Sequence, residues 1–327
     1  WHHKLFDVLT PQAKLTQLLL LIFNGRAVVT IFFVLSGYVA FLSLERSNFQ
    51  FNQTLRYYAK RLVRLYPVYF VVTLLTVLYV SSGFVHRRFD PYSGEWFWWW
   101  FNHKITPTEI VRNFLLMNVS LSGVAWSMRV EAFSTLLMPL FFFIVKKTTL
   151  VIDVCIALGI ALFAFHILKW SDLAFVSMCY MGMTLPKWKN ILNKKWLLML
   201  ALFLLTVPRM TMPDVYKIIG ETTGALILVS CLLYQELPRL KRFLQSRVLQ
   251  FYGSISYAFF LLHFLVLYIS SVIMFNTVPH YFLKTYPLPL MIALAIISIL
   301  IATPLSWLIH TYVEKPISKL SLPTTLP

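Results

Sequence analysis

The segment LPLMIALAIISILIATPLSWLIHT, residues 288–311, contains no Asp, Glu, Lys or Arg. About 20 mostly apolar residues in a helix cross the hydrocarbon core of a bilayer. Inside lipid every backbone polar group must bond within its own helix, because no water is there to replace the bond. The segment therefore predicts a transmembrane helix.

Nine segments in all have this length and character. We expect an all-α polytopic bundle, with the spans at 19–43, 58–82, 126–145, 148–168, 172–187, 196–209, 218–236, 254–275 and 288–311. The segments 172–187 and 196–209 are the shortest. No internal repeat at a fixed period is present.

Composition supports a membrane protein. Of 327 residues, 59% are hydrophobic and 13% charged, against roughly 25% charged in a typical soluble domain. The formal charge of +17 lies in short basic clusters between apolar segments, which is typical of membrane topology and gives no reason to expect nucleic acid as a partner. The three cysteines lie within apolar segments and predict neither a disulfide framework nor a metal site.

The loops predict an orientation. Most Lys and Arg residues fall on one of the two alternating sets of loops, and the positive-inside tendency makes that face cytoplasmic. The C-terminus is then cytoplasmic, and His2 and His3 lie toward the other side. The long loop 83–125 is expected on the membrane surface, because its aromatic cluster contains Trp96, Trp98, Trp99 and Trp100.

Polar residues inside spans are candidate site residues, since they are costly in lipid. Arg26 and the small pair Ser36-Gly37 lie in the first predicted span, although snorkelling and close helix packing would also explain them. Ser127 and Glu131 share one helical face, where Glu131 is suited either to a helix N-terminus or to orienting an imidazole, with Arg129 as a possible ion-pair partner.

Two further groups are ambiguous on their own. Ser256 and His263 lie on one face of a later span, about 10 Å apart along the axis, where a lone His often bonds a neighbouring helix. His310 and Glu314 end the last span. A basic ridge at the entry of the second span suits either the phosphates of a ligand or a positive-inside anchor, and consists of Arg56, Lys60, Arg61 and Arg64.

Five segments resemble, in order and spacing, the integral-membrane acyltransferase family 3 proteins. AVVTIFFVLSGY (27–38) is similar to the family's FFxLSG span and RYYAKRLVRLYPVYF (56–70) to its basic entry followed by RxYP. WSMRVE, beginning at Trp126, resembles WSLxxE. SISYAFFLLHF (254–264) and TYVEKP (311–316) resemble the late ISYxxYLxH and YxxxExP segments.

The resemblance implies one membrane domain over 1–327 with about ten helices and an acyl-CoA donor, commonly acetyl-CoA; no metal is expected, since the cysteine spacing fits none. It also implies a basic residue in the first span, followed after ten others by a catalytic His. His2 or His3 would be that His, with His2 preferred, so most of the first helix is expected to precede residue 1.

These expectations combine into a mechanism. His2 or His3 acts as general base or acyl carrier, oriented by Glu131 or Arg26. The donor phosphates are held by Arg56, Lys60, Arg61 and Arg64. The substrate tunnel is lined by Arg26, Ser36, Trp126, Ser127, Ser256 and His263.

The acceptor is expected to be a hydroxyl of a small lipophilic metabolite or of a glycan, and the lipid bilayer is a further partner. The alternatives are a transporter that uses the intramembrane ionisable groups as a solute path, and an inactive truncated family member.

Overall fold

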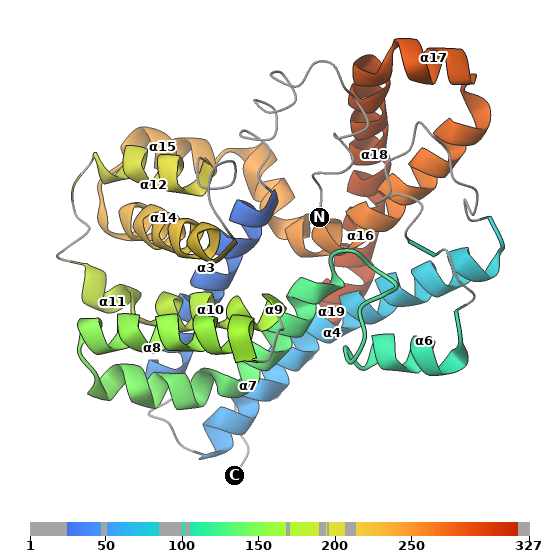
Figure 1. Cartoon of the computed structure of the whole chain (residues 1–327). Coiled ribbons are helices and arrows are strands. Elements are labelled where there is room, and N and C mark those ends of the chain that lie inside the picture. Colours follow the sequence, from blue (N-terminus) through green and yellow to red (C-terminus); the bar gives the residue numbers. More distant parts are fainter. Residues whose placement is uncertain are drawn as a thin grey trace. The chain divides into compact units, whose positions relative to one another are not determined.

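The computed structural model describes residues 25–46, 51–84, 100–101, 105–167, 171–189, 194, 196–206 and 214–319. Throughout these residues the secondary structure is helical, with no strand, so the all-α prediction is confirmed for them. Seven of the helices are long and apolar enough to cross a membrane. Figure 1 labels the elements along the chain.

The seven long helices correspond to seven of the predicted spans. Their cores are helices α3 (Gly25–Arg46), α4 (Phe51–Ser81), α7 (Ala125–Lys147), α8 (Leu150–Leu162) continued by the π-helix η1 (Phe163–Ile167), α14 (Asp214–Tyr234), α16 (Arg247–Thr277) and α18 (Pro287–Ile309). Pro67, Pro139 and Pro304 lie inside three of them. Membrane helices tolerate such prolines because neighbouring groups satisfy the freed carbonyls.

The predicted span 172–187 is wrong as one continuous helix. The structure has three short helices there: α9 (Ser171–Ala174), α10 (Val176–Met183) and α11 (Leu185–Trp188). Pro186 has no N–H to donate and its ring clashes with the preceding turn, which ends α10 at Thr184. The predicted span 196–209 contains α12 (Leu197–Thr206), a 10-residue apolar helix.

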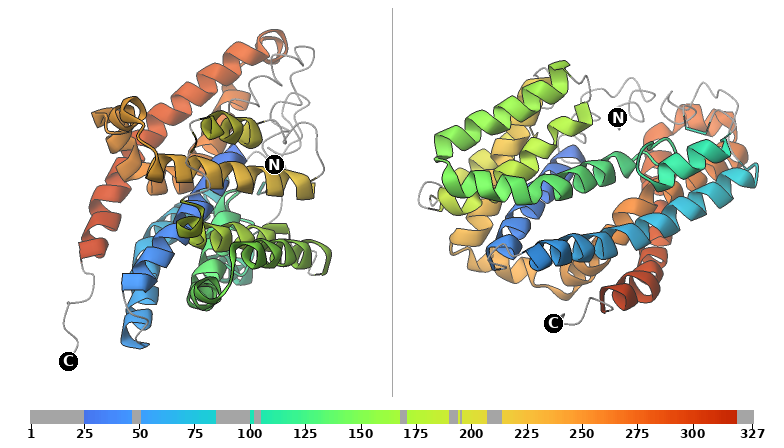
Figure 2. Two further views of the ribbon diagram at one scale, coloured as in Figure 1. Left: turned by 90° about the vertical axis from the view of Figure 1, so that its left-hand side faces the viewer. Right: turned by 90° about the horizontal axis from the view of Figure 1, so that it is seen from below.

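The chain divides into two compact units. Unit 2 comprises the described residues up to Arg61 together with those of Val130–Phe243. Within it α10 packs against α3 and α8, and α14 packs against α3 and α12. Figures 1 and 2 show α8 and α10 side by side.

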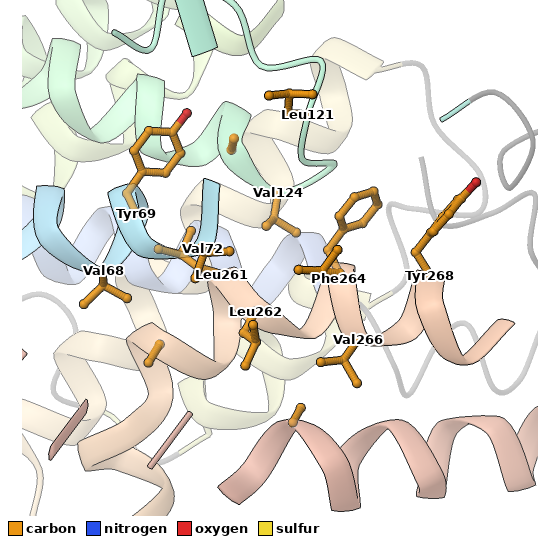
Figure 3. Packing of buried hydrophobic residues seen from close by; sticks show 14 of the residues in the cluster. Val68, Tyr69, Val72, Leu121, Val124, Leu261, Leu262, Phe264, Val266 and Tyr268 are labelled. Carbon is orange, nitrogen blue, oxygen red and sulfur yellow. The ribbon is translucent and has the colours of Figure 1, made fainter. Parts of the chain in front are cut away.

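Unit 1 comprises the described residues of Leu62–Arg129 and those from Leu244 onward. The short helices in it are α6 (Pro107–Phe114), α17 (His280–Thr285), the π-helix η2 (His310–Glu314) and α19 (Lys315–Lys319), whereas α15 (Pro238–Leu244) lies in unit 2 up to Phe243. Its apolar core joins α4, α7 and α16, and Figure 3 shows Val72 and Leu261 from two of these helices close together.

Trp100 lies within the unit 1 core. Its side chain is 6% exposed and its ring packs edge-on against Phe264, with the ring centroids 4.9 Å apart. The ring therefore packs inside the protein, where a large indole buries much apolar area, and the membrane-surface location of the loop 83–125 stays a prediction. Trp96, Trp98 and Trp99 lie outside the described residues.

Candidate functional site

Three polar side chains from separate helices meet in the interior of unit 2. Ser36 on α3 donates a hydrogen bond of 2.7 Å from Oγ to Oε1 of Glu131 on α7. Arg61 on α4 forms an ion pair with the same carboxylate oxygen and donates from its other terminal nitrogen to the backbone carbonyl of Ser36, at 3.0 Å. Arg61 also donates to Ser36 Oγ at 2.8 Å. We call these three residues the carboxylate cluster.

Close helix packing places Ser36 in this cluster. The next residue, Gly37, faces α10, and a Cβ there would lie 1.9 Å from the carbonyl oxygen of Cys179. A Cβ on Gly182 would lie 2.0 Å from the carbonyl oxygen of Val34. Small residues on both helices therefore let the α3 and α10 backbones touch, as interfaces between membrane helices favour.

Glu131 is the most deeply buried member of the cluster, with 1% of the residue exposed. A buried carboxylate is costly unless it is paired and hydrogen-bonded, and Arg61 and Ser36 meet that need at Oε1. Its other oxygen, Oε2, is buried and accepts no hydrogen bond from the described part of the chain. Oε2 is thus available to a donor that the described residues do not supply.

Sequence reasoning missed the residues that surround the cluster. The Arg61 guanidinium lies over the ring of Tyr57, 5.5 Å from its centroid. The Tyr57 hydroxyl in turn lies 3.2 Å from Met138 Sδ. Ser134, one turn after Glu131 on α7, is fully buried. The sequence could have indicated them by helical spacing, because Tyr57 lies one turn before Arg61, while Ser134 and Met138 lie one and two turns after Glu131.

Arg26 has a partner of its own in unit 2. Its Nε lies 2.8 Å from Oε2 of Glu221, a residue of α14 that is 1% exposed. Arg26 also lies over the ring of Phe175, 5.4 Å from the centroid. Because Arg26 precedes Ser36 by ten residues, it lies about 15 Å from the carboxylate cluster along α3. Glu221, an acid inside an apolar segment, could have been singled out from the sequence.

A second buried acid, Asp153, was also missed. Its Oδ2 lies 2.5 Å from Nζ of Lys187, and its Oδ1 accepts a 2.8 Å hydrogen bond from the Tyr180 hydroxyl. The positive-inside pattern predicts Lys187 among the basic residues of the cytoplasmic loops. In the structure its ammonium is partly withdrawn from the surface and also donates to the Thr148 carbonyl at 2.8 Å.

The four residues of the predicted basic ridge differ in their exposure. Lys60 and Arg64 are exposed, whereas Arg56 is partly buried and has interactions of its own. Arg61 turns inward to the carboxylate cluster. The expected pairing of Glu131 with Arg129 is replaced in the structure by the pairing with Arg61. Residues two apart on a helix do not face each other, so Arg129 was a poor choice.

Four predicted site residues belong to unit 1. Ser127 is buried and donates to the Val124 carbonyl at 2.8 Å, while Trp126 is partly buried. Ser256 is exposed and donates to the Gly253 carbonyl of its own helix at 2.9 Å. Their tunnel role stays a prediction.

His263, the fourth, is held by its own helix. Its Nδ1 lies 2.6 Å from the Phe260 carbonyl oxygen and must donate, since a carbonyl only accepts. The ring stacks on Phe259 at an interplanar angle of 9°. Elsewhere in unit 1, His310 Nδ1 lies 2.8 Å from Glu314 Oε2 within η2.

His2 and His3 lie outside the described residues. In the part of the chain that the structure describes, no group of three or more His, Cys, Asp or Glu side chains is arranged to hold a metal ion.

Comparison with known proteins gives one match. The sequence model of the family Acyl_transf_3, described as an acyltransferase domain, matches residues 2–311. Neither a curated protein nor a solved structure matches the chain.

Proposed function

The chain belongs to acyltransferase family 3 and is a multi-pass membrane acyltransferase, and from that premise we propose that it moves an acyl group, expected to be acetyl, from acyl-CoA to a hydroxyl group. The acceptor we propose is a small lipophilic metabolite or a glycan. The donor is expected to approach from the cytoplasmic face, where basic side chains gather.

One observation carries the proposal. Ser36, Arg61 and Glu131 come from three of the segments that resemble the family, and they form one buried cluster in unit 2. Buried charge is costly, so a cluster assembled from three distant segments supports a role beyond packing. Acyl transfer needs a base, a polar environment for developing charge, and exclusion of water.

In the proposed reaction the imidazole of His2 or His3 takes the proton of the acceptor hydroxyl. The hydroxyl oxygen then bonds to the thioester carbonyl carbon, the C–S bond breaks, and the imidazolium returns its proton to the departing thiolate of CoA. Alternatively the imidazole carries the acyl group between the two substrates. A neutral imidazole suits the first step, since its ordinary pKa of about 6.5 leaves it largely unprotonated at pH 7.

Glu131 is proposed to orient that imidazole. Its Oε2 is the carboxylate oxygen left without a donor among the described residues, and an imidazole N–H is a donor of suitable chemistry. A carboxylate on one ring nitrogen fixes the tautomer, so that the other nitrogen is the base. The phosphates of the donor are proposed to bind the basic side chains exposed on α4, Lys60 and Arg64, with Arg56 beside them.

The test uses membranes that contain the protein. They are incubated with radiolabelled acetyl-CoA and a panel of extracted metabolites and glycans, and products are analysed by mass spectrometry. The proposal expects release of free CoA and one product that has gained a single acetyl group. Solute flux through liposomes without consumption of acyl-CoA would instead identify a transporter and contradict the proposal.

A further inference from the structure

Helix α15 has no buried residue. The basic side chains of Arg239, Lys241 and Arg242 are exposed, and Phe243 is 62% exposed. These four residues all belong to unit 2. An isolated helix this short is not stable in water, and most helical stability in proteins comes from packing of one face. The exposed faces of α15 are therefore suited to a surface other than the protein itself.

The apolar and basic side chains of α15 lie on different sides of the helix. At 3.6 residues per turn, Leu240 and Phe243 share one face, Lys241 and Arg242 lie on the opposite side, and Arg239 lies at the border. The helix sequence contains no acidic residue. In the parts of the chain that the structure describes, none of the three cations is paired with an acidic side chain. Helix α15 is thus amphipathic, and its positive charge is not neutralised by unit 2.

The place of α15 in the chain keeps it near the membrane surface. The candidate span formed by α14 ends at Tyr234, and Pro238 follows four residues later. Four extended residues reach at most about 14 Å, so α15 begins close to the headgroup layer. The connection is anchored, because Gln235 Nε2 donates to the Lys194 carbonyl at 3.0 Å. Lys194 is exposed as well, and it adds a fourth cation at this end of α14.

We propose that α15 is a binding site for anionic phospholipids, in which Arg239, Lys241 and Arg242 contact headgroup phosphates and Phe243 inserts among the acyl chains. Helices that lie in the membrane interface divide their apolar and basic side chains in this way. The negative surface of a leaflet attracts Lys and Arg clusters next to a membrane helix. The exposed Phe243 favours a lipid over a soluble phosphate compound, which has no acyl chain to cover the ring. The inference is independent of the proposed acyl transfer.

The test measures lipid binding to the full chain in neutral detergent by native mass spectrometry. The protein is titrated with phosphatidylglycerol, which is anionic, or with phosphatidylcholine, which has no net charge. In the variant Arg239→Gln/Lys241→Gln/Arg242→Gln, the Kd of the tightest-bound phosphatidylglycerol should rise by about 100-fold, since each basic residue at such a surface contributes about fivefold. The Kd for phosphatidylcholine should change by less than about twofold, because the lost attraction is electrostatic.

Two further variants separate a defined site from general attraction. Arg46→Gln/Lys147→Gln/Lys189→Gln removes three exposed cations elsewhere in unit 2, so its net charge equals that of the α15 variant, and it should keep the tight site. Phe243→Ser tests the apolar side of the helix. It should weaken phosphatidylglycerol binding by about tenfold, as expected when a large aromatic side chain loses its burial.

Equal losses of phosphatidylglycerol binding in the two triple variants would overturn the inference, because net charge alone would then explain binding. Unchanged binding in Phe243→Ser, or displacement of the lipid by coenzyme A at equal concentration, would also overturn it and indicate a site for soluble phosphates. If the α15 triple variant aggregates, Arg242→Gln decides alone. A loss of about fivefold supports the inference, and unchanged affinity contradicts it.

Discussion

Ser36 donates a 2.7 Å hydrogen bond to Glu131 across 95 residues of sequence. Both residues are buried, and Arg61 bonds to each of them. The contact links the first described helix to the middle of unit 2. It gives the small-residue pair Ser36-Gly37 two functions, since Ser36 binds the carboxylate and Gly37 admits α10.

Ser36→Ala should reduce acyl transfer without preventing folding. The change removes one hydrogen bond to the Glu131 carboxylate, and such bonds to charged groups contribute about 1.5–3 kcal/mol. We expect kcat to fall by about tenfold, which corresponds to about 1.4 kcal/mol. The measurement is initial rate of CoA release. Ser254→Ala is the matched control, because that hydroxyl is exposed and bonds only its own helix, and equal rates for both variants would refute the prediction.

Lys187→Met should destabilise unit 2. The substitution leaves the buried Asp153 carboxylate without its cation, which typically costs about 3–5 kcal/mol. A marked drop in melting temperature in detergent is expected. Lys189→Met, an exposed neighbour, should melt like the unaltered protein. The double variant Asp153→Asn/Lys187→Met should recover much of the loss, and no recovery would show that the ion pair is not the cause.

Gly37→Ala should disrupt the packing of α3 on α10. Its Cβ would lie 1.9 Å from a backbone oxygen, so the helices must separate. We expect a loss of stability of about 1–3 kcal/mol, typical of overpacking, and reduced acyl transfer because Ser36 is displaced. Gly159→Ala in α8 is the control: a Cβ there meets no atom within 4 Å, and alanine favours a helix by up to about 1 kcal/mol. Equal stability of the two variants would contradict this account.

His2→Ala/His3→Ala should reduce acyl transfer to the background of membranes without the protein, because the proposed general base is lost. His166→Ala is the control, since its side chain is exposed on η1 and belongs to no proposed site. The readout is labelled product per amount of purified protein. Normal turnover after removal of both imidazoles would exclude them as base or acyl carrier.

Hydropathy predicted the long helices because lipid requires a continuous helix over the whole apolar length. It failed at 172–187, where the chain forms three short helices and Pro186 interrupts the backbone bonds between the last two. Spacing within a single helix also suggested the wrong cation, Arg129, as the partner of Glu131. The true partner, Arg61, is 70 residues away, and such a pair depends on tertiary packing that periodicity does not contain.

The buried acids show what sequence could have added. Asp153 and Glu221 lie in predicted spans, where an ionisable group is costly and requires a partner. The position of each acid within an apolar segment therefore made it a candidate site residue from the sequence alone. Which cation it binds, Lys187 or Arg26, depends on which helices meet, and only the structure supplies that.

The most direct test compares Glu131→Gln with Glu45→Gln for transfer of label from acetyl-CoA to an extractable product. Glu131 is buried at the cluster, whereas Glu45 forms an exposed ion pair with Lys146 in the same unit. The account predicts that Glu131→Gln lowers transfer by about 100-fold or more, as expected when proton transfer is impaired, while Glu45→Gln is unaffected. Equal transfer by the two variants would contradict it.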